Sequence, residues 1–344
     1  MSRLSENSRK AILLLNVGTP DKAELGSVRK YLSEFLNDPL VVDLPWLLRK
    51  ILVNLIIVPF RAPKSTKLYQ QVWETNGSPL LSNTLKLQTK LQAKIGGGDQ
   101  VFIAMRYGNP SIRLALNQIK KGAFDQLILV PLFPQYAQST SQTAIQEVKR
   151  LVATLNDFPP LKIVGQFYNH PEFIQAWVSR AKEYDLNLFD HFVFSFHGLP
   201  LSHIQKIHPH HDNANCMCNI EMPPNGQDCY KATCYATARQ LAFALNLKTH
   251  NYSIAFQSRL SKNWLSPFTD KVILRLAKEG KKKVLIFAPS FVADCLETKV
   301  ELGVEYADLF RKAGGEKLQL LESLNDTDAW VKALYAIISE SEKN

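Results

Sequence analysis

The 344-residue chain is long enough for two domains of ordinary size. Its 46% hydrophobic and 21% charged residues are typical of a globular protein and exclude a disordered or fibrous one. The formal charge of +10 favours an anionic partner, such as a carboxylate substrate or a membrane surface. No nucleic-acid motif accompanies the one dense basic run, residues 281–283, so we expect no nucleic-acid partner.

The N-terminus and the apolar stretches predict neither secretion nor a membrane span. Residues 1–10 are polar, with no apolar core and no cleavage signature of a secretory signal. No uninterrupted apolar stretch reaches the length of a transmembrane helix. We therefore expect a cytoplasmic protein whose five cysteines are reduced or bound to metal.

The first part of the chain predicts a buried strand followed by an unusually apolar segment. Residues 11–17 form an apolar run with one polar residue, Asn16, and end at Gly18-Thr19-Pro20, as a parallel strand and its exit loop would. The later stretch 40–60 contains three charged residues and two prolines, so it is poorly suited to span a bilayer. Two interpretations stay open for it: a pair of buried core helices, or the rim of an apolar pocket that also contacts a membrane.

The elements that follow alternate between strands and helices. A strand over 100–105 ends at Arg106 and Tyr107, which places polar side chains at its carboxyl end. A further strand is expected over 126–133, and the next over 161–167. This alternation predicts parallel sheets with helices on both faces.

A break at Asp157-Phe158-Pro159-Pro160 divides the alternation into two halves. We therefore expect an N-terminal domain over 1–157 and a C-terminal domain over 158–325. The closing amphipathic helix, within 326–344, is expected to pack back on the first domain.

A histidine follows an aromatic strand in the second half. Residues 191–196 are mostly apolar, rich in phenylalanine and of strand length, and Gly198 and Pro200 end the strand. His197 therefore lies at the carboxyl end of a strand, where open α/β sheets bind ligands and where an imidazole can move a proton. The residues alone leave a second interpretation open, in which His197 only forms hydrogen bonds with backbone groups in a tight turn.

Carboxylates recur at every fourth position in a helix that we expect to begin at Phe291. Glu297, Glu301 and Glu305 would lie on nearly one face of an α-helix, part of which is apolar. Such stacked carboxylates could conduct protons or pass a divalent cation. A solvated acidic face is the alternative.

Four of the five cysteines fall within 19 residues, in the pattern Cys-x-Cys-x10-Cys-x4-Cys. Four thiols in one cytosolic segment favour metal ligation over disulfides, and four thiolates suit zinc or a [2Fe–2S] cluster. The spacing lacks the paired Cys-x2-Cys knuckles of a zinc ribbon, and free reduced thiols remain an alternative. The four residues are Cys216, Cys218, Cys229 and Cys234.

Four motifs in order resemble those of the ferrochelatases, which insert ferrous iron into a porphyrin. They are LNVGTP at 15–20, FPQYAQST at 133–140, FSFHGLP at 194–200 and FVADCLET at 291–298. The similarity is collinear from about residue 11 to the end and is interrupted chiefly at 213–228.

The resemblance implies an α/β fold of two Rossmann-like domains, each a parallel sheet flanked by helices, that enclose a porphyrin cleft. The apolar lip of this cleft would lie at about 40–80 in the first domain. The histidine, the acidic helix and the cysteine insert at about 213–234 would lie in the second.

The implied reaction inserts Fe2+ into protoporphyrin IX and forms protohaem with release of two protons, as the terminal step of haem biosynthesis. The implied partners are protoporphyrin IX and Fe2+, with peripheral contact between the lip and the inner membrane; the oligomeric state is not implied. Because the rim at 40–60 is apolar, it favours a tetrapyrrole with few carboxylates, hence protoporphyrin.

Residue roles are carried over from the resemblance position by position. His197 resembles the histidine at the porphyrin centre, Glu297 its partner carboxylate, and Glu301 the next group on an acidic path, all three as handlers of protons or metal. The four-cysteine insert resembles one that holds a [2Fe–2S] cluster in some members, which favours this cluster over zinc. The implied substrate-binding residues are Arg61, Tyr69 and Ser78 for the propionates, and Arg106, Tyr107 and Trp264 for the cleft.

Three positions depart from the family pattern. Val17 stands where other members carry methionine, leucine or tyrosine, so it offers the metal no ligand. Phe133 replaces a tyrosine of some members, and Cys295 replaces a histidine. We expect Cys295 to be a small buried side chain rather than a metal ligand.

Two alternative functions stay open. The first is a chelatase for another metal or tetrapyrrole, such as cobalt or coproporphyrin. The second is a non-catalytic porphyrin or haem carrier in which the cysteine centre senses metal. The acidic residues behind the histidine favour the enzyme, because a carrier would need only the cleft.

Overall fold

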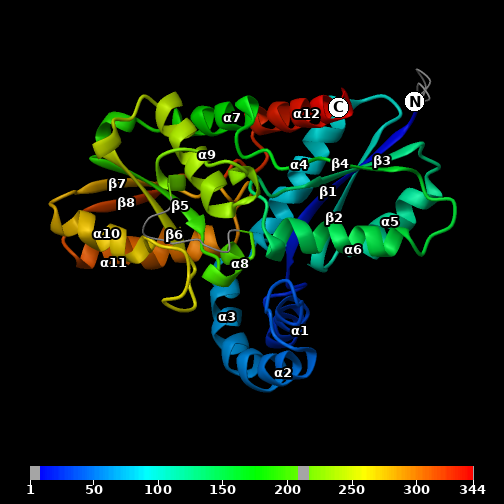
Figure 1. The fold of residues 1–344 in the computed structure, drawn as a ribbon, viewed down its shortest axis with the longest axis horizontal. Coiled ribbons are helices and arrows are strands. Elements are labelled where there is room, and N and C mark those ends of the chain that lie inside the picture. Colours follow the sequence, from blue (N-terminus) through cyan, green and yellow to red (C-terminus); the bar gives the residue numbers. More distant parts are fainter. Residues whose placement is uncertain (1–7, 208–216, 344) are drawn as a thin grey trace. The chain divides into compact units, whose positions relative to one another are not determined.

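The computed structural model describes residues 8–207 and 217–343, which divide into two compact units. Unit 1 contains residues 1–133, 137–165 and 335–344, and unit 2 contains residues 134–136 and 166–334. The predicted α/β class is confirmed, because each unit is built on a four-stranded parallel sheet flanked by helices (Figure 1). Within the described residues, no helix combines the length and apolarity needed to cross a bilayer.

The sheet of unit 1 has the strand order β2-β1-β3-β4. Its central strand pairs with both neighbours in register, so that Leu13 lies between Phe102 and Leu129. This arrangement buries the apolar run of the central strand from both sides. The strands are β1 (Lys10–Thr19), β2 (Gln100–Gly108), β3 (Gln126–Pro131) and β4 (Leu161–Ile163).

The last strand of this sheet differs from expectation. We had assigned the strand that begins at 161 to the second domain, whereas β4 is an edge strand of unit 1, which extends to Gly165. Backbone hydrogen bonds at both of its ends hold it on β3, from Leu127 N to Pro160 O and from Val164 N to Leu129 O.

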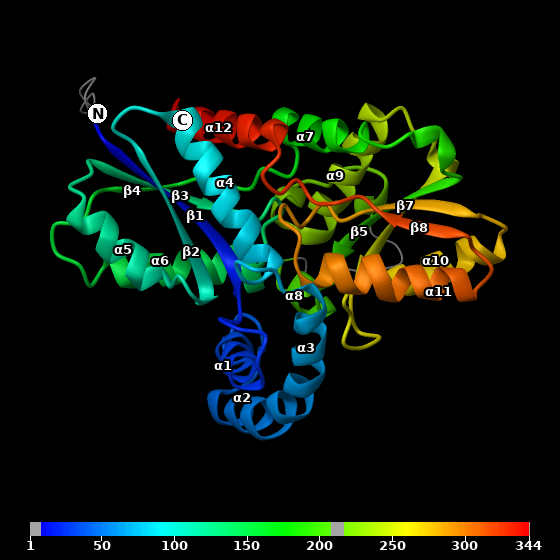
Figure 2. The same ribbon diagram turned by 180° about the vertical axis from the view of Figure 1, so that it is seen from behind.

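Helices cover both faces of this sheet, with α4 on one face and α5 and α6 on the other (Figures 1 and 2). The segment between β1 and α4 leaves the sheet as a helical arm, in which α1 packs against α3. Unit 1 contains two helical segments of the π type, one in this arm and one between β3 and α6. The helices of unit 1 are α1 (Leu25–Leu36), α2 (Trp46–Ile51), the π-helix η1 (Leu52–Ile57), α3 (Val58–Val72), α4 (Pro79–Ile95), α5 (Ile112–Lys121), the π-helix η2 (Gln138–Gln142) and α6 (Thr143–Val152).

Glycine is required where β1 and β2 end. Gly18 has a φ of 114°, and a Cβ there would lie 1.9 Å from the carbonyl oxygen of Tyr107. Gly108 has a φ of 78°, and its Cβ would lie 2.5 Å from the carbonyl oxygen of Thr19. The two strand ends therefore approach closely only because both side chains are absent, which fixes the backbone of the Arg106–Tyr107 pair.

The sheet of unit 2 has the strand order β6-β5-β7-β8, again all parallel. Side chains of β5 alternate between two apolar layers. Val193 packs with α10 and α11, whereas Phe194 and Phe196 join an aromatic layer to which α7 contributes Trp177. The strands are β5 (His191–His197), β6 (Tyr252–Gln257), β7 (Lys283–Phe287) and β8 (Lys317–Leu320), of which β8 was not predicted.

The helices of unit 2 surround this sheet, and the last of them continues into unit 1. The division between the units falls inside this helix, between Leu334 and Tyr335. The helices are α7 (Pro171–Ala181), η3 (Leu186–Leu188), α8 (Leu201–Gln205), η4 (Met217–Asn219), η5 (Gly226–Asp228), α9 (Tyr230–Ala244), η6 (Thr249–Asn251), α10 (Thr269–Lys278), the π-helix η7 (Glu297–Glu305), α11 (Tyr306–Lys312) and α12 (Asp328–Lys343).

Candidate functional site

The backbone at His197 is held from two sides, at the carboxyl end of β5. Its N–H donates to Ser290 Oγ over 3.2 Å, and its carbonyl accepts from the Tyr230 hydroxyl over 2.9 Å. Tyr230 is buried and begins α9, and Ser290 follows β7. Residues far apart in the sequence thus fix one peptide unit.

The ring of His197 has a defined tautomer. Nδ1 lies 2.7 Å from the carbonyl oxygen of Gly198. Because a carbonyl can only accept, Nδ1 must carry the hydrogen, and in the neutral ring Nε2 then keeps its lone pair. The half-buried histidine therefore presents a base at Nε2.

Aromatic rings flank this base. The ring centroid of Trp264 lies 6.4 Å from that of His197, and the centroid of Phe291 lies at 6.1 Å. Gly198 permits this packing, because a Cβ there would lie 2.8 Å from Gln257 O and 3.3 Å from the Trp264 ring. The structure thus brings together two of the predicted residues, His197 and Trp264.

The acidic helix differs from the predicted α-helix in its start and in its type. The π-helix η7 begins at Glu297 rather than near Phe291. Asp294 and Thr298 set this start, since the Thr298 hydroxyl donates to Asp294 Oδ1 over 2.9 Å and accepts from Cys295 N over 3.0 Å. π-helical segments are rare and occur frequently at functional sites.

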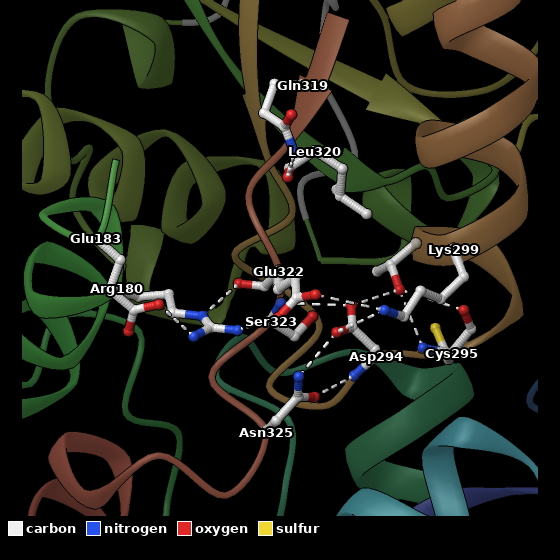
Figure 3. Close-up of polar contacts among 11 residues, drawn as sticks. Arg180, Glu183, Asp294, Cys295, Lys299, Gln319, Leu320, Glu322, Ser323 and Asn325 are labelled. Atoms are coloured by element: carbon white, nitrogen blue, oxygen red, sulfur yellow. Dashed lines mark hydrogen bonds and ion pairs between the residues drawn. The ribbon is translucent and has the colours of Figure 1, made fainter. Parts of the chain in front are cut away.

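Asp294 is the most deeply buried carboxylate of this region, and the sequence analysis did not assign it a role (Figure 3). Its Oδ2 accepts from Asn325 Nδ2 over 2.8 Å, and Oδ1 also accepts from Ser323 N over 3.3 Å. Lys299 Nζ lies 3.9 Å from Oδ2. Asp294 lies only three positions before Glu297, which was the available signal, but Ser323 and Asn325, which also satisfy it, lie on a distant segment after β8.

Figure 3 also shows that this network extends from Lys299 to Glu322, Arg180 and Glu183. Lys299 Nζ lies 3.7 Å from a carboxylate oxygen of Glu322, which is in turn paired with Arg180. Arg180 also binds Glu183 over 2.6 Å. The start of η7 is therefore held in place by charged side chains on α7 and on the segment that follows β8.

Glu297 is half-buried and lies beside Cys295. Burial raises the pKa of the Cys295 thiol well above its ordinary value, and the Glu297 charge and its hydrogen bond to the thiol raise it further. The thiol therefore remains protonated and donates to Glu297. The expected small buried side chain at Cys295 is present.

Glu301 is held by three donors. Its Oε1 accepts from Ser258 N over 2.8 Å and from Tyr306 Oη over 2.7 Å, and its Oε2 accepts from Ser258 Oγ over 2.5 Å. Burial, followed by the Glu301 charge, raises the pKa of Tyr306. This carboxylate joins η7 to the end of β6, whereas Glu305 is exposed.

Arg106 and Tyr107 form a network with two residues that the sequence analysis did not single out. Asp38 Oδ2 accepts from Arg106 Nη2 over 2.6 Å and from Tyr107 Oη over 2.9 Å. Thr143 Oγ1 accepts from Arg106 Nε over 2.8 Å and donates to the same carboxylate oxygen. The network lines a pocket of about 630 Å3 in unit 1. The polar Asn37-Asp38 pair that precedes the apolar stretch was the available signal.

The three residues predicted to bind propionates are placed differently from one another. Arg61 is exposed on α3, and Tyr69 is buried on the same helix, with its ring edge-on to Trp73 at 6.0 Å. Ser78 is buried and caps α4 by accepting from Leu81 N over 3.3 Å. Ser78 therefore has a structural role in addition to any contact with a substrate.

The apolar stretch is largely exposed, so its interpretation as a pair of buried core helices was wrong. α2, η1 and the first turn of α3 present a row of large apolar side chains to solvent, because the arm packs only through a few positions such as Val53 and Val58. The exposed members are Leu44, Trp46, Leu47, Leu48, Ile51, Leu55, Ile56 and Phe60.

Three of the four predicted cluster ligands lie in the described residues, and Cys216 lies outside them. Cys218, Cys229 and Cys234 are completely buried, around η4 and the first turn of α9. Burial raises the pKa of the Cys234 thiol well above its ordinary value, and the neighbouring Cys229 and Cys218 raise it further. Within residues 8–207 and 217–343, no three or more His, Cys, Asp or Glu side chains form a group able to hold a metal ion.

The candidate residues thus fall into two sets, one in each unit. His197, Trp264, Glu297 and Glu301 belong to unit 2 together with the cysteines. The other set, which belongs to unit 1, contains Arg61, Tyr69, Ser78, Arg106 and Tyr107.

Comparison with known proteins gives a consistent family. The model of the ferrochelatase family matches residues 9–342. A ferrochelatase of Legionella pneumophila (strain Paris) is 42% identical over 336 residues, which cover 96% of this chain and 99% of the relative. A ferrochelatase of Coxiella burnetii (strain Dugway 5J108-111) is 40% identical over 349 residues, covering 98% of this chain and 95% of the relative.

Solved structures show a related fold at low identity. SirB from Bacillus subtilis with Fe3+ has a TM-score of 0.56 at 13% identity, covering 97% of this chain and 95% of that one. The sirohydrochlorin chelatase SirB of a Bacillus subtilis subspecies, in complex with cobalt, has a TM-score of 0.54 at 11% identity, covering 98% of this chain and 96% of that one. At such identities the likeness concerns the fold alone.

Replacing Tyr230 with phenylalanine tests how strongly the peptide at His197 is held. The change deprives the His197 carbonyl of its donor, so we expect Tyr230→Phe to destabilise the protein by about 1–3 kcal/mol. The measurement is the urea unfolding midpoint. Tyr252→Phe is the matched control on β6, because its hydroxyl has no hydrogen bond to the described residues; we expect a shift of less than about 0.5 kcal/mol there. Equal shifts in the two variants would contradict the assignment.

Proposed function

The chain belongs to the ferrochelatase family, metal chelatases of the lyase class that insert iron into a porphyrin in haem synthesis, and we propose that its substrate is protoporphyrin IX and that His197 and Glu297 accept the two pyrrole protons. The resemblance inferred from four motifs is thereby confirmed at the level of the family. The observation that carries the residue assignment is the tautomer of His197, which leaves Nε2 free as a base.

The proposed reaction exchanges two protons for one metal ion. Fe2+ enters the macrocycle as two N–H bonds break, so two protons must be accepted near the pyrrole nitrogens. Neutral His197 accepts one at Nε2, and its Nδ1–H continues to donate to the Gly198 carbonyl, which keeps the imidazolium oriented. The Glu297 carboxylate, which is half-buried at the start of η7, accepts the second.

The remaining predicted residues have supporting parts in this proposal. Trp264 packs beside His197 and presents an apolar surface to the macrocycle. Glu301 stabilises η7 through Ser258 and Tyr306 and takes protons or metal from Glu297. The residues proposed to bind the substrate from unit 1 are Arg61, Tyr69, Ser78, Arg106 and Tyr107.

We further propose that the cysteine segment holds a [2Fe–2S] cluster through Cys216, Cys218, Cys229 and Cys234. The support for this proposal is the gathering of four cysteines within 19 residues, because thiolates are the ligands that such clusters use. In the described residues, Cys218, Cys229 and Cys234 do not form a preformed ligand group, so binding of the cluster would have to bring the thiols together. The cluster would supply a cross-link within the segment, and metal insertion draws no electron from it.

We propose a cytoplasmic protein that touches the membrane through the exposed apolar row of the arm. Phe60 is 81% exposed and Leu55 69% exposed, and Lys50 lies in the same segment, so apolar insertion and attraction to anionic lipid would act together. A large exposed apolar patch of this kind marks an interaction surface.

The proton acceptors are tested by anaerobic insertion of Fe2+ into protoporphyrin IX, followed through the porphyrin spectrum. We expect turnover to fall by about 10²–10⁴-fold in His197→Ala and in Glu297→Gln, since each variant lacks a positioned base. His250→Ala and Glu305→Gln are matched controls at exposed positions and should keep near-normal turnover. Normal turnover in folded His197→Ala would refute the assignment. Tight porphyrin binding without insertion by the wild type would favour a carrier, and preference for coproporphyrin or cobalt another chelatase.

The cluster is tested by the absorption spectrum of anaerobically purified protein. We expect visible sulfide-to-iron bands that disappear in Cys229→Ser and persist in Cys295→Ser, the cysteine outside the proposed ligand set. A colourless wild type with stoichiometric zinc would exclude the iron–sulfur cluster in favour of a zinc site.

Membrane contact is tested by flotation with vesicles of mixed zwitterionic and anionic lipid. Leu55→Glu and Phe60→Glu each place a charge in the apolar row, and we expect the vesicle-bound fraction to fall several-fold. Phe243→Glu is the control, because Phe243 is 89% exposed but lies on α9, away from the arm in sequence. Absence of a bound fraction for the wild type at low salt would contradict the proposal.

A further inference from the structure

Asp38 is a buried residue of unit 1 whose carboxylate accepts hydrogen bonds from several segments of the chain. Its side chain is 5% exposed, and one of its oxygens, Oδ2, accepts hydrogen bonds from Arg106, Tyr107 and Thr143. The other oxygen, Oδ1, accepts from Leu40 N over 2.8 Å. Four donors therefore converge on one carboxylate, and two of them, Leu40 N and Arg106 Nη2, are groups that can only donate.

Asp38 also fixes the start of the apolar arm. Its own carbonyl accepts from Val41 N over 3.0 Å and from Val42 N over 2.9 Å, which closes the turn between α1 and the apolar stretch. The side chain then ties this turn to Arg106 at the end of β2 and to Thr143 at the start of α6. Three segments that are distant in sequence are thus locked by one residue.

The result is a guanidinium held in one orientation. Arg106 Nη2 binds Asp38, Nε binds Thr143, and the guanidinium carbon lies 4.5 Å from the centre of the Tyr107 ring. Nη1 has no hydrogen bond to the described residues and belongs to a side chain that lines the 630 Å3 pocket. A fixed cation with one unused donor edge is suited to an anionic group of a ligand.

We propose that Asp38 is a positioning residue for substrate binding, which holds Arg106 and Tyr107 against the porphyrin and fixes the base of the arm relative to them. This rests on the proposed role of Arg106 in porphyrin binding. Asp38 is buried and both of its oxygens are occupied by donors of the chain, so it acts on the porphyrin through Arg106 and Tyr107, and its loss weakens binding of the porphyrin in the ground state and the transition state alike.

Asparagine at position 38 is the appropriate probe because it keeps the shape and removes the charge. One orientation of the amide turns its NH2 toward Leu40 N and the other turns it toward Arg106 Nη2, and both of these groups can only donate. We expect Asp38→Asn to raise the KM for protoporphyrin IX by about tenfold or more, with kcat within about twofold of the wild type.

The control is Asp190→Asn in unit 2. Asp190 Oδ2 accepts from Lys282 N over 2.7 Å and from Lys283 N over 2.8 Å, so this carboxylate is also well bonded, but it faces no arginine network. We expect Asp190→Asn to lower the unfolding midpoint and to leave KM unchanged. An equal rise of KM in both variants would show that Asp38→Asn acts through general destabilisation and would overturn the proposal.

A double-mutant cycle that combines Asp38→Asn with Arg106→Lys tests whether Asp38 acts through Arg106. If Asp38 acts through Arg106, the KM of the double variant rises by less than the product of the two single rises. A KM equal to that product, or no effect of Arg106→Lys alone, would overturn the proposal. The dissociation constant from porphyrin fluorescence is measured in parallel, so a failure of iron insertion in the wild type is recognised as a failure of the proposed function instead.

A second pair of variants keeps the test informative if Asp38→Asn does not fold. Thr143→Val removes the hydroxyl that donates to Asp38 and accepts from Arg106, whereas Thr143→Ser keeps it. We expect a raised KM in the valine variant and recovery in the serine variant. A raised KM in both, or in neither, would contradict the positioning role.

Discussion

The candidate site of unit 2 depends on one peptide unit, at His197. A strand end is normally free to fray, but here the N–H and C=O of the last strand residue are both bonded, to Ser290 and Tyr230. The next carbonyl orients the imidazole, and the missing side chain of Gly198 admits the Trp264 ring. Hydrogen bonds to the backbone therefore define where the imidazole points, and no charged side chain of the described residues pairs with the ring.

The buried carboxylates divide by the number of donors that surround them. Asp294 is bonded to a hydroxyl, an amide and a backbone N–H, so its charge is compensated where it lies. Glu301 has three donors and ties η7 to β6. Glu297 lies between these anchored groups and is half-buried, with the Cys295 thiol beside it. Among these three carboxylates, Glu297 is therefore the one that the described residues hold least tightly.

The sequence was most informative where local patterns decide the structure. A largely apolar run ended by Gly198 and Pro200 correctly predicted β5 with His197 at its end, because the residues that end a strand are its immediate neighbours in the sequence. The π-helix was not predictable in the same way: glutamates at every fourth position fit an α-helix equally well, and the contacts that hold η7 come from Ser258 and Asn325. Asp38 escaped notice for a similar reason, since its partners are 68 to 105 positions away. Long-range polar pairing leaves no periodic signal in the chain.

The division of α12 between the units has a consequence for the order in which the protein is made. Unit 1 contains the first strand, β1, and also the last residues of the chain. Lys10 at the start of β1 forms an ion pair with Glu342, and Lys94 lies 5.4 Å from the ring centre of Tyr335. These residues of unit 1 are synthesised after all of unit 2, so unit 2 can complete its contacts while unit 1 still lacks a part. Unit 1 is thus the unit whose synthesis begins first and whose contacts are completed last.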